Sequence, residues 1–255
     1  MTHLLLALTL FMPQSAATPI VAKKVTVAPK VIAEFEMSKL KGVIRRLAWN
    51  ADGTELYLQT AELRSDALVK EAFHYTLNPK TGDLKKVDAE PAWAAEYYAW
   101  KSWKSAPDDD KFLIELATET RRSAATSLPM AGEMARGGGV DPTSGASAES
   151  VMAAAQQSQS GTANLMRLKG QTVGEWMNQP IVPGQSFGWG PKGTGAIAYA
   201  ETNNRQLVIM DKSGDRQKIS DTKGVYAPAF SPDATKIAWI EVRGKKANLV
   251  IGDVK

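Results

Sequence analysis

Four copies of one short pattern recur along this chain. Each copy has an aromatic residue, a turn rich in Pro, Asp, Asn or Gly, and then an apolar run typical of a β-strand. The clearest copy is residues 230–239, FSPDATKIAW. Residues 49–58 repeat it without a gap, residues 189–199 repeat it with one residue inserted, and residues 103–114 carry a degenerate copy. The repeats constrain the fold strongly, because each copy is expected to form the same supersecondary unit.

A second pair of apolar runs, separated by a turn, follows every copy except the last one along the chain. These runs are residues 73–77 and 84–87, 164–168 and 172–176, and 206–210 and 216–219. Apolar runs bounded by Gly, Pro, Asn and Asp are typical of strand-turn-strand units. Trp189 and Phe230 are 41 positions apart, and repeats of about 40 residues with four strands each indicate a β-propeller. We therefore predict an all-β chain that forms a small propeller of about four four-stranded blades.

The last unit lacks a fourth strand, because the chain ends at Lys255 soon after the apolar run 248–251. Near the other end, residues 31–36 resemble a strand that belongs to no unit. Pairing this N-terminal strand with the last blade removes an exposed sheet edge, so we predict that the ring closes in this way. A three-blade arc with ragged ends, or a half-ring completed by dimerisation, are the alternatives.

The N-terminus begins with an apolar run, residues 4–12, followed by Pro13 and the small residues 15–17. A run this short does not span a bilayer as a helix, and its pattern predicts a secretory signal over residues 1–17. It lacks the usual Lys or Arg, and a buried helix or an uncleaved anchor are the alternatives. We expect a linker over 18–30, a propeller over 31–255, and a periplasmic or secreted protein that is soluble after cleavage.

The second unit contains an insertion, since 86 positions separate Trp103 from Trp189. Its middle, about residues 123–161, is rich in Gly, Ser, Ala and Gln. Such a segment buries too little apolar area to offset the entropy lost on ordering. We predict a long flexible insertion in the second blade, with a short helix over 147–157 as one possibility.

Composition excludes several kinds of chemistry. The chain has no Cys and only two His, of which His3 falls in the predicted signal. Disulfides, thiolate nucleophiles and zinc sites built from several His or Cys are therefore excluded. The net charge of +4 comes without a block of like charges, so we expect no nucleic-acid partner. We predict no cofactor, no metal site and no catalytic residue.

Three motifs resemble sites of chemistry, but structural roles explain them better. Residues 184–188, GQSFG, fit the nucleophile pattern of α/β-hydrolases, but no His follows Ser186, as that triad order requires. His74 lies in an apolar strand, where it faces solvent or a neighbouring blade. Asp108, Asp109 and Asp110 occupy the turn of the repeat, and their spacing does not match a calcium loop.

The motif Phe230-Ser231-Pro232-Asp233 resembles the TolB-like family of WD-type propeller repeats, with Ala234 in place of the usual Gly. The resemblance covers about residues 47–255 and implies a propeller of a kind used by binding scaffolds, periplasmic assembly proteins and gating domains of peptidases. The matching residues are structural: Pro and Asp begin a turn, Gly tolerates a positive φ, and the aromatic residues pack between blades.

Basic residues recur in the connections between second and third strands, which share one side of a ring. They are Arg64, Arg121, Arg122, Arg205 and Arg243, with Lys245 beside the last. Converging cations suit an acidic partner, although nearby Asp and Glu residues dilute the charge. In the aromatic cluster at residues 93–103, Trp93 is the candidate for an exposed anchor, and core packing is the alternative for the cluster as a whole.

These observations favour an exported, non-enzymatic scaffold that binds a protein or cell-envelope partner through one loop face. One alternative is a propeller-type hydrolase acting on a small ester, lactone or glycan through carboxylates. Another is the regulatory remnant of a peptidase-type propeller. The paucity of His and of metal ligands favours the scaffold.

Overall fold

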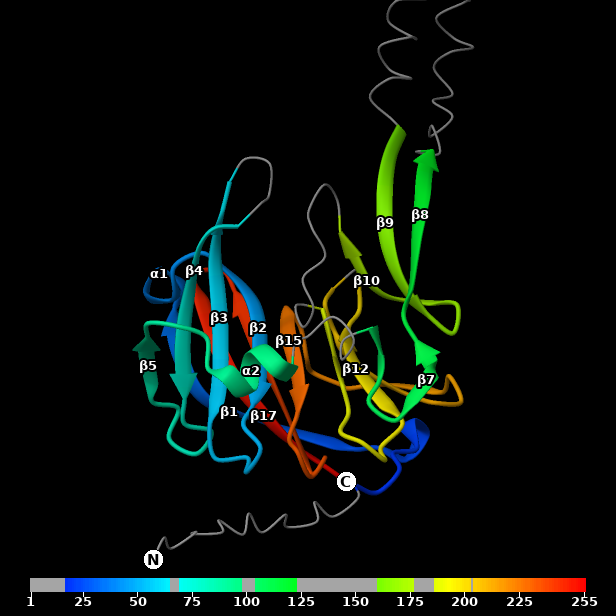
Figure 1. Ribbon diagram of the computed structural model, residues 1–255, viewed down its shortest axis with the longest axis horizontal. Coiled ribbons are helices and arrows are strands. Elements are labelled where there is room, and N and C mark those ends of the chain that lie inside the picture. The colour runs from blue at the N-terminus through cyan, green and yellow to red at the C-terminus, as the bar shows by residue number, and fades with distance from the viewer. Residues whose placement is uncertain (1–16, 65–68, 98–103, 123–159, 177–185, 203) are drawn as a thin grey trace, which may run out of the picture.

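The chain forms antiparallel sheets arranged as a four-blade β-propeller, as the sequence predicts (Figure 1). This computed structural model describes residues 17–64, 69–97, 104–122, 160–176, 186–202 and 204–255. Each blade starts with its innermost strand and runs outward. None of the described helices is both long enough and apolar enough to cross a membrane.

Blades 1 and 3 are regular four-stranded sheets in which neighbouring strands follow one another along the chain. Blade 1 contains β2 (Val43–Trp49), β3 (Leu56–Leu63), β4 (Val69–Leu77) and β5 (Leu84–Val87). Blade 3 contains β11 (Phe187–Trp189), β12 (Ala196–Ala200), β13 (Leu207–Asp211) and β14 (Arg216–Lys218). Every strand expected in these two units is present.

Blade 2 is split into two sheets. Its strands are β6 (Ser105–Ala106), β7 (Asp109–Leu113), β8 (Glu115–Arg122), β9 (Ser160–Leu168) and β10 (Gln171–Trp176). β6 pairs with β7, while β8, β9 and β10 form a separate sheet. Only Ile114 separates β7 from β8, so the two together take the place of one second strand. The degenerate copy of the pattern thus gives a short inner strand and an interrupted neighbour.

Blade 4 is closed by the N-terminal strand, which confirms the predicted closure. It contains β15 (Val225–Phe230), β16 (Lys236–Arg243), β17 (Lys246–Val254) and, as its outermost strand, β1 (Val27–Glu36). β1 runs antiparallel to β17, from Val27 opposite Val254 to Glu36 opposite Lys246. β1 begins within the 18–30 segment expected as a linker, and α1 (Met37–Leu40) then leads into blade 1.

The segment before β1 lies against blade 3. It contains η1 (Ala22–Lys24), and the Ile20 N–H donates to the Thr194 carbonyl at 3.0 Å. The Ala22 N–H donates to the Asp211 carboxylate at 2.9 Å. The segment therefore joins the closing strand of blade 4 to the neighbouring blade.

In the described part of the chain, hydrophobic clusters fill three of the four boundaries between blades. One cluster joins blades 1 and 4, a second joins blades 2 and 3, and a third joins blades 3 and 4. The repeated aromatics lie in them, as expected: the Trp49 indole N–H donates to the Ala229 carbonyl at 3.0 Å, and Trp189 meets Phe112 edge-on at 5.3 Å between ring centroids. Among the described residues, the boundary between blades 1 and 2 is lined instead by polar side chains and α2 (Ala92–Tyr97).

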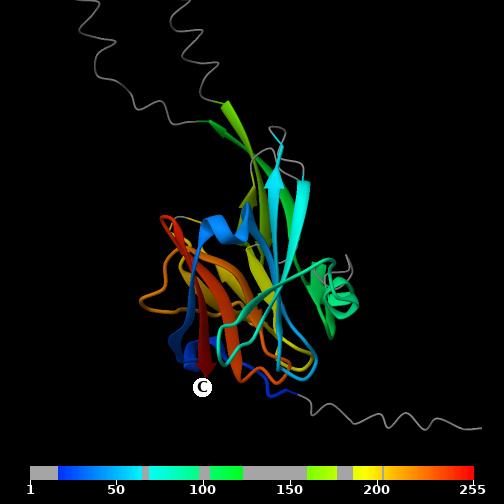
Figure 2. The same cartoon turned by 90° about the vertical axis from the view of Figure 1, so that its left-hand side faces the viewer.

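Some sequence-based predictions lie outside the described residues. These are most of the signal segment (1–16), nearly all of the insertion with its possible helix at 147–157, and Trp103. The insertion is attached to β8 and β9, which form a two-stranded ribbon projecting from the body of the propeller (Figures 1 and 2).

Candidate binding surfaces

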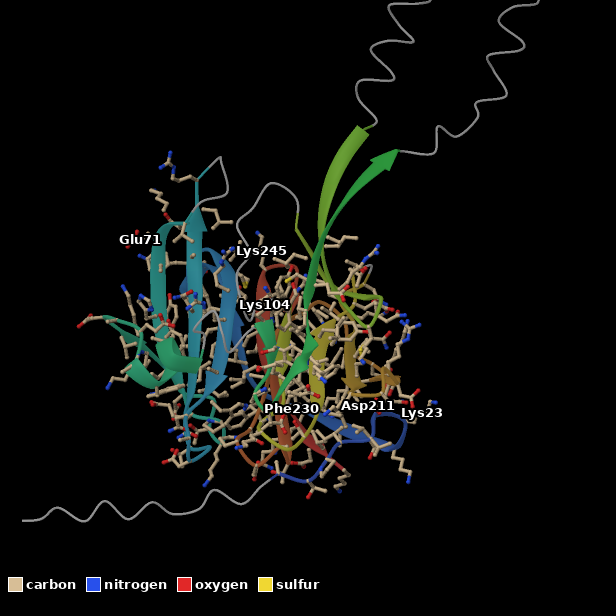
Figure 3. All side chains as sticks on the ribbon, turned by 45° about the vertical axis from the view of Figure 1, so that its right-hand side comes forward. Lys23, Glu71, Lys104, Asp211, Phe230 and Lys245 are labelled. Atoms are coloured by element: carbon tan, nitrogen blue, oxygen red, sulfur yellow. The ribbon has the colours of Figure 1, made fainter. Side chains whose placement is uncertain are left out.

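The connections between second and third strands lie on one side of the ring, which we call the connection side. The ends of the β3–β4 and β8–β9 hairpins point the same way in both ribbon views (Figures 1 and 2). In Figure 3, Glu71 near the start of β4 and Lys245 between β16 and β17 lie toward this side, whereas Phe230 and Asp211 lie toward the opposite one. All the arginines expected to form the basic patch belong to these connections.

Arg64 follows the last residue of β3 and is exposed. Arg121 and Arg122 are the last residues of β8, opposite Gly161 and Ser160 of β9, and their side chains are not among those described. These three arginines therefore belong to the two hairpins that extend farthest on the connection side (Figure 1).

Arg205 is built into the boundary between blades 3 and 4. It adopts a positive φ of 51°, its Nε–H donates to the Val225 carbonyl at 2.8 Å, and its guanidinium lies 3.8 Å from the centre of the Tyr226 ring. Burial lowers the pKa of the Arg205 guanidinium. Cation–π contacts and hydrogen bonds of this kind hold a side chain in one position. Arg205 is therefore a fixed part of the connection side and not a mobile charge.

Arg243 is the last residue of β16 in blade 4. Its guanidinium binds the Glu241 carboxylate at 2.7 Å, with 60% of its own side chain exposed and only 5% of that of Glu241. The Trp239 indole N–H donates to the same carboxylate at 3.2 Å. Glu241 in turn is opposite Val225, the strand residue that Arg205 bonds. Arg243 thus binds a buried carboxylate whose residue is opposite the one that Arg205 bonds.

Acidic side chains reduce the positive charge of the connection side. Glu241 binds Arg243, Glu62 lies 3.4 Å from Lys70, and Glu201 lies 2.6 Å from Lys218. The result is a mixed surface in which Arg64 and Arg243 are exposed. Such a surface suits a partner with localised acidic groups better than a uniformly charged polymer.

Trp93 is placed away from the arginines. It lies in α2, is partly buried, and meets Tyr57 edge-on at 6.2 Å between ring centroids. Tyr57 is near the start of β3, whereas Arg64 follows its end. Trp93 therefore belongs to the boundary between blades 1 and 2, and the structure does not bring it to the arginines of the connection side.

A polar cluster lines that boundary on blade 1. We call it the Tyr57 cluster; its members are Arg46, Tyr57, Gln59, His74, Glu90 and Trp93. Strand register explains it, because Arg46, Gln59 and His74 are opposite one another on β2, β3 and β4 and so form one row on one sheet face. The opposite face of blade 1 carries the apolar residues that pack on blade 4.

Hydrogen bonds hold the Tyr57 cluster together. The Tyr57 hydroxyl lies 2.7 Å from His74 Nδ1 and accepts a bond from the Gln59 amide at 3.2 Å. Arg46 binds Glu90 at 3.1 Å. Burial, with a smaller contribution from Glu90, raises the pKa of Tyr57, so Tyr57 stays a neutral phenol. Sequence reasoning weighed His74 alone and missed this row, for which the signal is a polar residue at every second position of β3, Tyr57 and Gln59.

The other candidate motifs occupy structural positions. Ser186 is buried and directly precedes β11, which is an inner strand followed by a turn, whereas a nucleophile elbow requires a helix there. Asp108 accepts the Gly193 N–H at 2.9 Å, and Asp109 binds Lys212 and the Lys111 N–H. Within the described part of the chain, no three His, Asp or Glu residues are grouped as metal ligands.

No protein-family model matches the sequence, and no curated protein matches it. Solved structures similar to it include an oligogalacturonate lyase in complex with manganese (10% identity, TM-score 0.25), for which the match covers 79% of this chain and 46% of that one. A TolB-like protein from Agrobacterium tumefaciens has 14% identity, a TM-score of 0.20, and coverage of 85% and 62%. An oligogalacturonate lyase from Vibrio parahaemolyticus has 10% identity, a TM-score of 0.28, and coverage of 90% and 98%. The chain spans less than two thirds of the first two proteins.

Proposed function

We propose that this protein is an exported, non-enzymatic propeller scaffold of the TolB-like type. It binds a protein or cell-envelope partner through the connection side. The observation that carries the proposal is the recurrence of arginines in the second-to-third-strand connections, all on one side of the ring. The apolar N-terminal run supports export to the periplasm or the exterior.

The arginines have two roles in this proposal. Arg205, fixed on Tyr226 and on the Val225 carbonyl, gives the surface its shape. Arg64 and Arg243 are exposed, and in this proposal they contact acidic groups of the partner. Arginines at an interface contribute most where the partner removes water from them, so affinity depends on both charge and fit.

The test is co-purification from envelope fractions with the full chain and a double variant, Arg64→Glu with Arg243→Glu. The matched control is Lys80→Glu with Lys192→Glu, which makes the same change of charge in exposed turns on the opposite side of the ring. We expect one specific partner to be lost from the first variant and retained by the second. Equal recovery of the same partners with both variants would contradict the proposal.

The insertion provides a further comparison, since it is attached to the same side. Replacing residues 123–159 by a short Gly-Ser linker between β8 and β9 preserves the described strands. Loss of the specific partner assigns part of the interface to the insertion. Retention restricts the interface to the blades.

A second candidate function is hydrolysis of a small ester, lactone or glycan at the Tyr57 cluster. What favours it is that this cluster brings His74 and the Glu90 carboxylate to one boundary, and general acid–base catalysis uses these groups. The test is hydrolysis of a panel of chromogenic esters, lactones and glycosides by the full chain, by His74→Gln and by Glu90→Gln. Activity that survives both substitutions excludes this cluster as its source.

A further inference from the structure

Arg45 is a buried cation in the innermost strand of blade 1. Its side chain is among the largest that are fully buried, with 1% of its surface exposed. Ile44 is opposite Thr60 and Arg46 is opposite Gln59, so Arg45 is the extra residue of a β-bulge in β2. β2 is the edge strand of its sheet, and its free edge is the one nearest the ring axis. Bulges often re-aim a side chain next to a functional site.

The two terminal nitrogens of the Arg45 guanidinium are available as hydrogen-bond donors. Among the described residues, neither Nη1 nor Nη2 of Arg45 has a hydrogen-bond partner. The Glu90 carboxylate is bound to Arg46, the next residue along the strand. Burial and then the adjacent Arg46 lower the pKa of Arg45 to about 10, as is expected for a cation without a counter-ion.

A buried charge without a partner is strongly unfavourable, so proteins retain one where a ligand or counter-ion completes it. The two terminal nitrogens of a guanidinium form a planar fork that matches two oxygens of a carboxylate or a phosphate. A single-atom anion such as chloride cannot accept two parallel hydrogen bonds from the two terminal nitrogens as well as an oxyanion can. The chemistry of the site therefore selects an oxyanion.

We infer that Arg45 binds a small oxyanion, a carboxylate or a phosphate, next to the axis of the ring. The anion accepts hydrogen bonds from Nη1 and Nη2 of Arg45 and lies in the positive potential of Arg45 and Arg46. The central channel of a propeller gives access to inner strands. Arg45 is not one of the arginines assigned to the partner surface, so the inference does not depend on the proposed partner.

The experiment measures thermal unfolding of the full chain in sodium chloride, sodium phosphate and sodium acetate at equal ionic strength and pH. We expect the midpoint to rise saturably with phosphate or acetate and not with chloride. A ligand at ten times its Kd should raise it by about 3–6 °C in a protein of this size. A rise with phosphate alone identifies a phosphate site, and a rise with acetate alone identifies a carboxylate site.

Arg45→Met is the decisive variant, because it keeps the apolar stem and removes the charge. It should fold, be at least as stable as the wild type in chloride, and give no saturable response to either anion. Lys80→Met is the matched control and should respond as the wild type does, since Lys80 is an exposed turn residue outside the proposed partner surface. Phosphate also stabilises proteins without binding to a site. The anion-dependent shift of the unfolding midpoint is therefore compared between these two variants, and its difference measures binding at Arg45.

Two results overturn the inference. One is the absence of a saturable rise in the wild type with both anions, which requires no variant. The other is an equal saturable rise in Arg45→Met. Should Arg45→Met not fold, Arg45→Lys replaces it; loss of the fork should then weaken anion binding at least tenfold by titration calorimetry, and unchanged binding overturns the inference equally.

Discussion

At the scale of single residues, the turn of the repeat explains why Asp and Gly recur. In blade 4 the Asp233 carboxylate accepts hydrogen bonds from the Ser231 hydroxyl at 2.6 Å and the Thr235 N–H at 3.1 Å. The residue between Asp233 and Thr235 adopts a positive φ, which is 60° at Ala234. Gly53 has φ 70° after the corresponding Asp of blade 1. The substitution of Ala for the usual Gly therefore leaves strain in blade 4.

Replacing Ala234 by Gly should stabilise the protein. A left-handed conformation costs an L-residue about 1–2 kcal/mol, and the extra unfolded-state entropy of Gly removes part of that gain. We expect Ala234→Gly to raise the free energy of unfolding by about 0.5–1 kcal/mol, measured by urea denaturation. The reciprocal change, Gly53→Ala, should lower it by about 1 kcal/mol, although its added methyl group would meet only Pro232 at 3.9 Å. A loss of stability in Ala234→Gly, or a gain in Gly53→Ala, would show that φ does not decide stability here.

Asp211 makes stability depend on pH through the N-terminal segment. Its carboxylate accepts the N–H groups of Ala22 and Ser213, both at 2.9 Å. Burial alone would raise the pKa of Asp211, but the hydrogen bond from the Ser213 hydroxyl, together with these N–H groups, outweighs it and holds the pKa below the usual 3.8. A lowered pKa in the folded state stabilises the protein above the unfolded-state pKa, and this contribution is lost as the pH falls through the folded-state pKa.

We expect Asp211→Asn to be less stable than the wild type at pH 7, since the amide provides one acceptor in place of two. The difference in free energy of unfolding should shrink below about pH 4, where Asp211 becomes protonated in the unfolded chain. Urea midpoints at pH 7 and pH 3 measure it. Asp253→Asn is the control, because its ion pair with Lys236 is exposed and contributes little at either pH. A difference that is the same at both pH values would contradict this account.

At the scale of elements, the strands that follow a turn motif could be predicted from the sequence. The run 84–87 is β5 to the residue, and the N-terminal closing strand pairs as expected. β9 is longer than expected, since it begins at Ser160 rather than at residue 164. Ser160 and Gly161 carry no strand signal of their own, and pairing with β8 makes them part of a strand. Tertiary pairing of this kind overrides local propensity.

The sites were predicted less well than the strands. Arg205 and Arg243 lie on the same side of the ring because successive blades have the same geometry, which the repeat implies. The Tyr57 cluster depends on which residues of β2, β3 and β4 are opposite one another, and the bulge at Arg45 shifts that register. A single sequence does not reveal a bulge at a non-glycine residue, so the row of polar residues and the buried Arg45 both required the structure.

Inner strands of neighbouring blades approach so closely that one glycine is required. A Cβ added to Gly188 of β11 would lie 2.1 Å from the backbone carbonyl oxygen of Pro228 in β15. Backbone cannot move aside as a side chain can, so we expect Gly188→Ala to separate blades 3 and 4 and lower the free energy of unfolding by about 1–3 kcal/mol.

Gly174→Ala is the matched control for this substitution. A Cβ at Gly174 would lie equally close, at 2.1 Å, to the end of the Met166 side chain, which is flexible. We expect its cost in urea denaturation to stay under about 1 kcal/mol. Equal losses from the two variants would show that the approach of the inner strands is not what limits residue 188.

At the scale of the whole molecule, the ring depends on the pairing of its two ends. Three boundaries contain hydrophobic clusters, and the cluster between blades 1 and 4 includes Ile32, Ala33 and Phe35 of β1 at its edge. Without β1, the long strand β17 becomes an unpaired edge, and unpaired edges promote association between chains. β1 therefore completes a sheet, covers part of the core and protects an edge at once.

The two ends are also close enough to be joined. Thr26 and Lys255 exchange both backbone hydrogen bonds, at 2.9 and 3.0 Å, so a two-residue Asn-Gly turn could link residue 255 to residue 26 as a β-hairpin. Three chains make the comparison: residues 26–255, residues 37–255, and residues 37–255 followed by Asn-Gly and residues 26–36. All three lack the segment before residue 26, so they differ only in the closing strand and its connection.

We expect the rearranged chain to match residues 26–255 in urea midpoint and in elution as one species on size exclusion, because the β1–β17 ladder is restored from the other terminus. Residues 37–255 should unfold at lower urea or elute as aggregates, since β17 is then an open edge. If residues 37–255 prove as stable and as monodisperse as residues 26–255, the closing strand is dispensable and the ring is held by its inner strands alone. If the rearranged chain fails while residues 26–255 fold, it is the connection through α1 that blade 4 needs, rather than the strand itself.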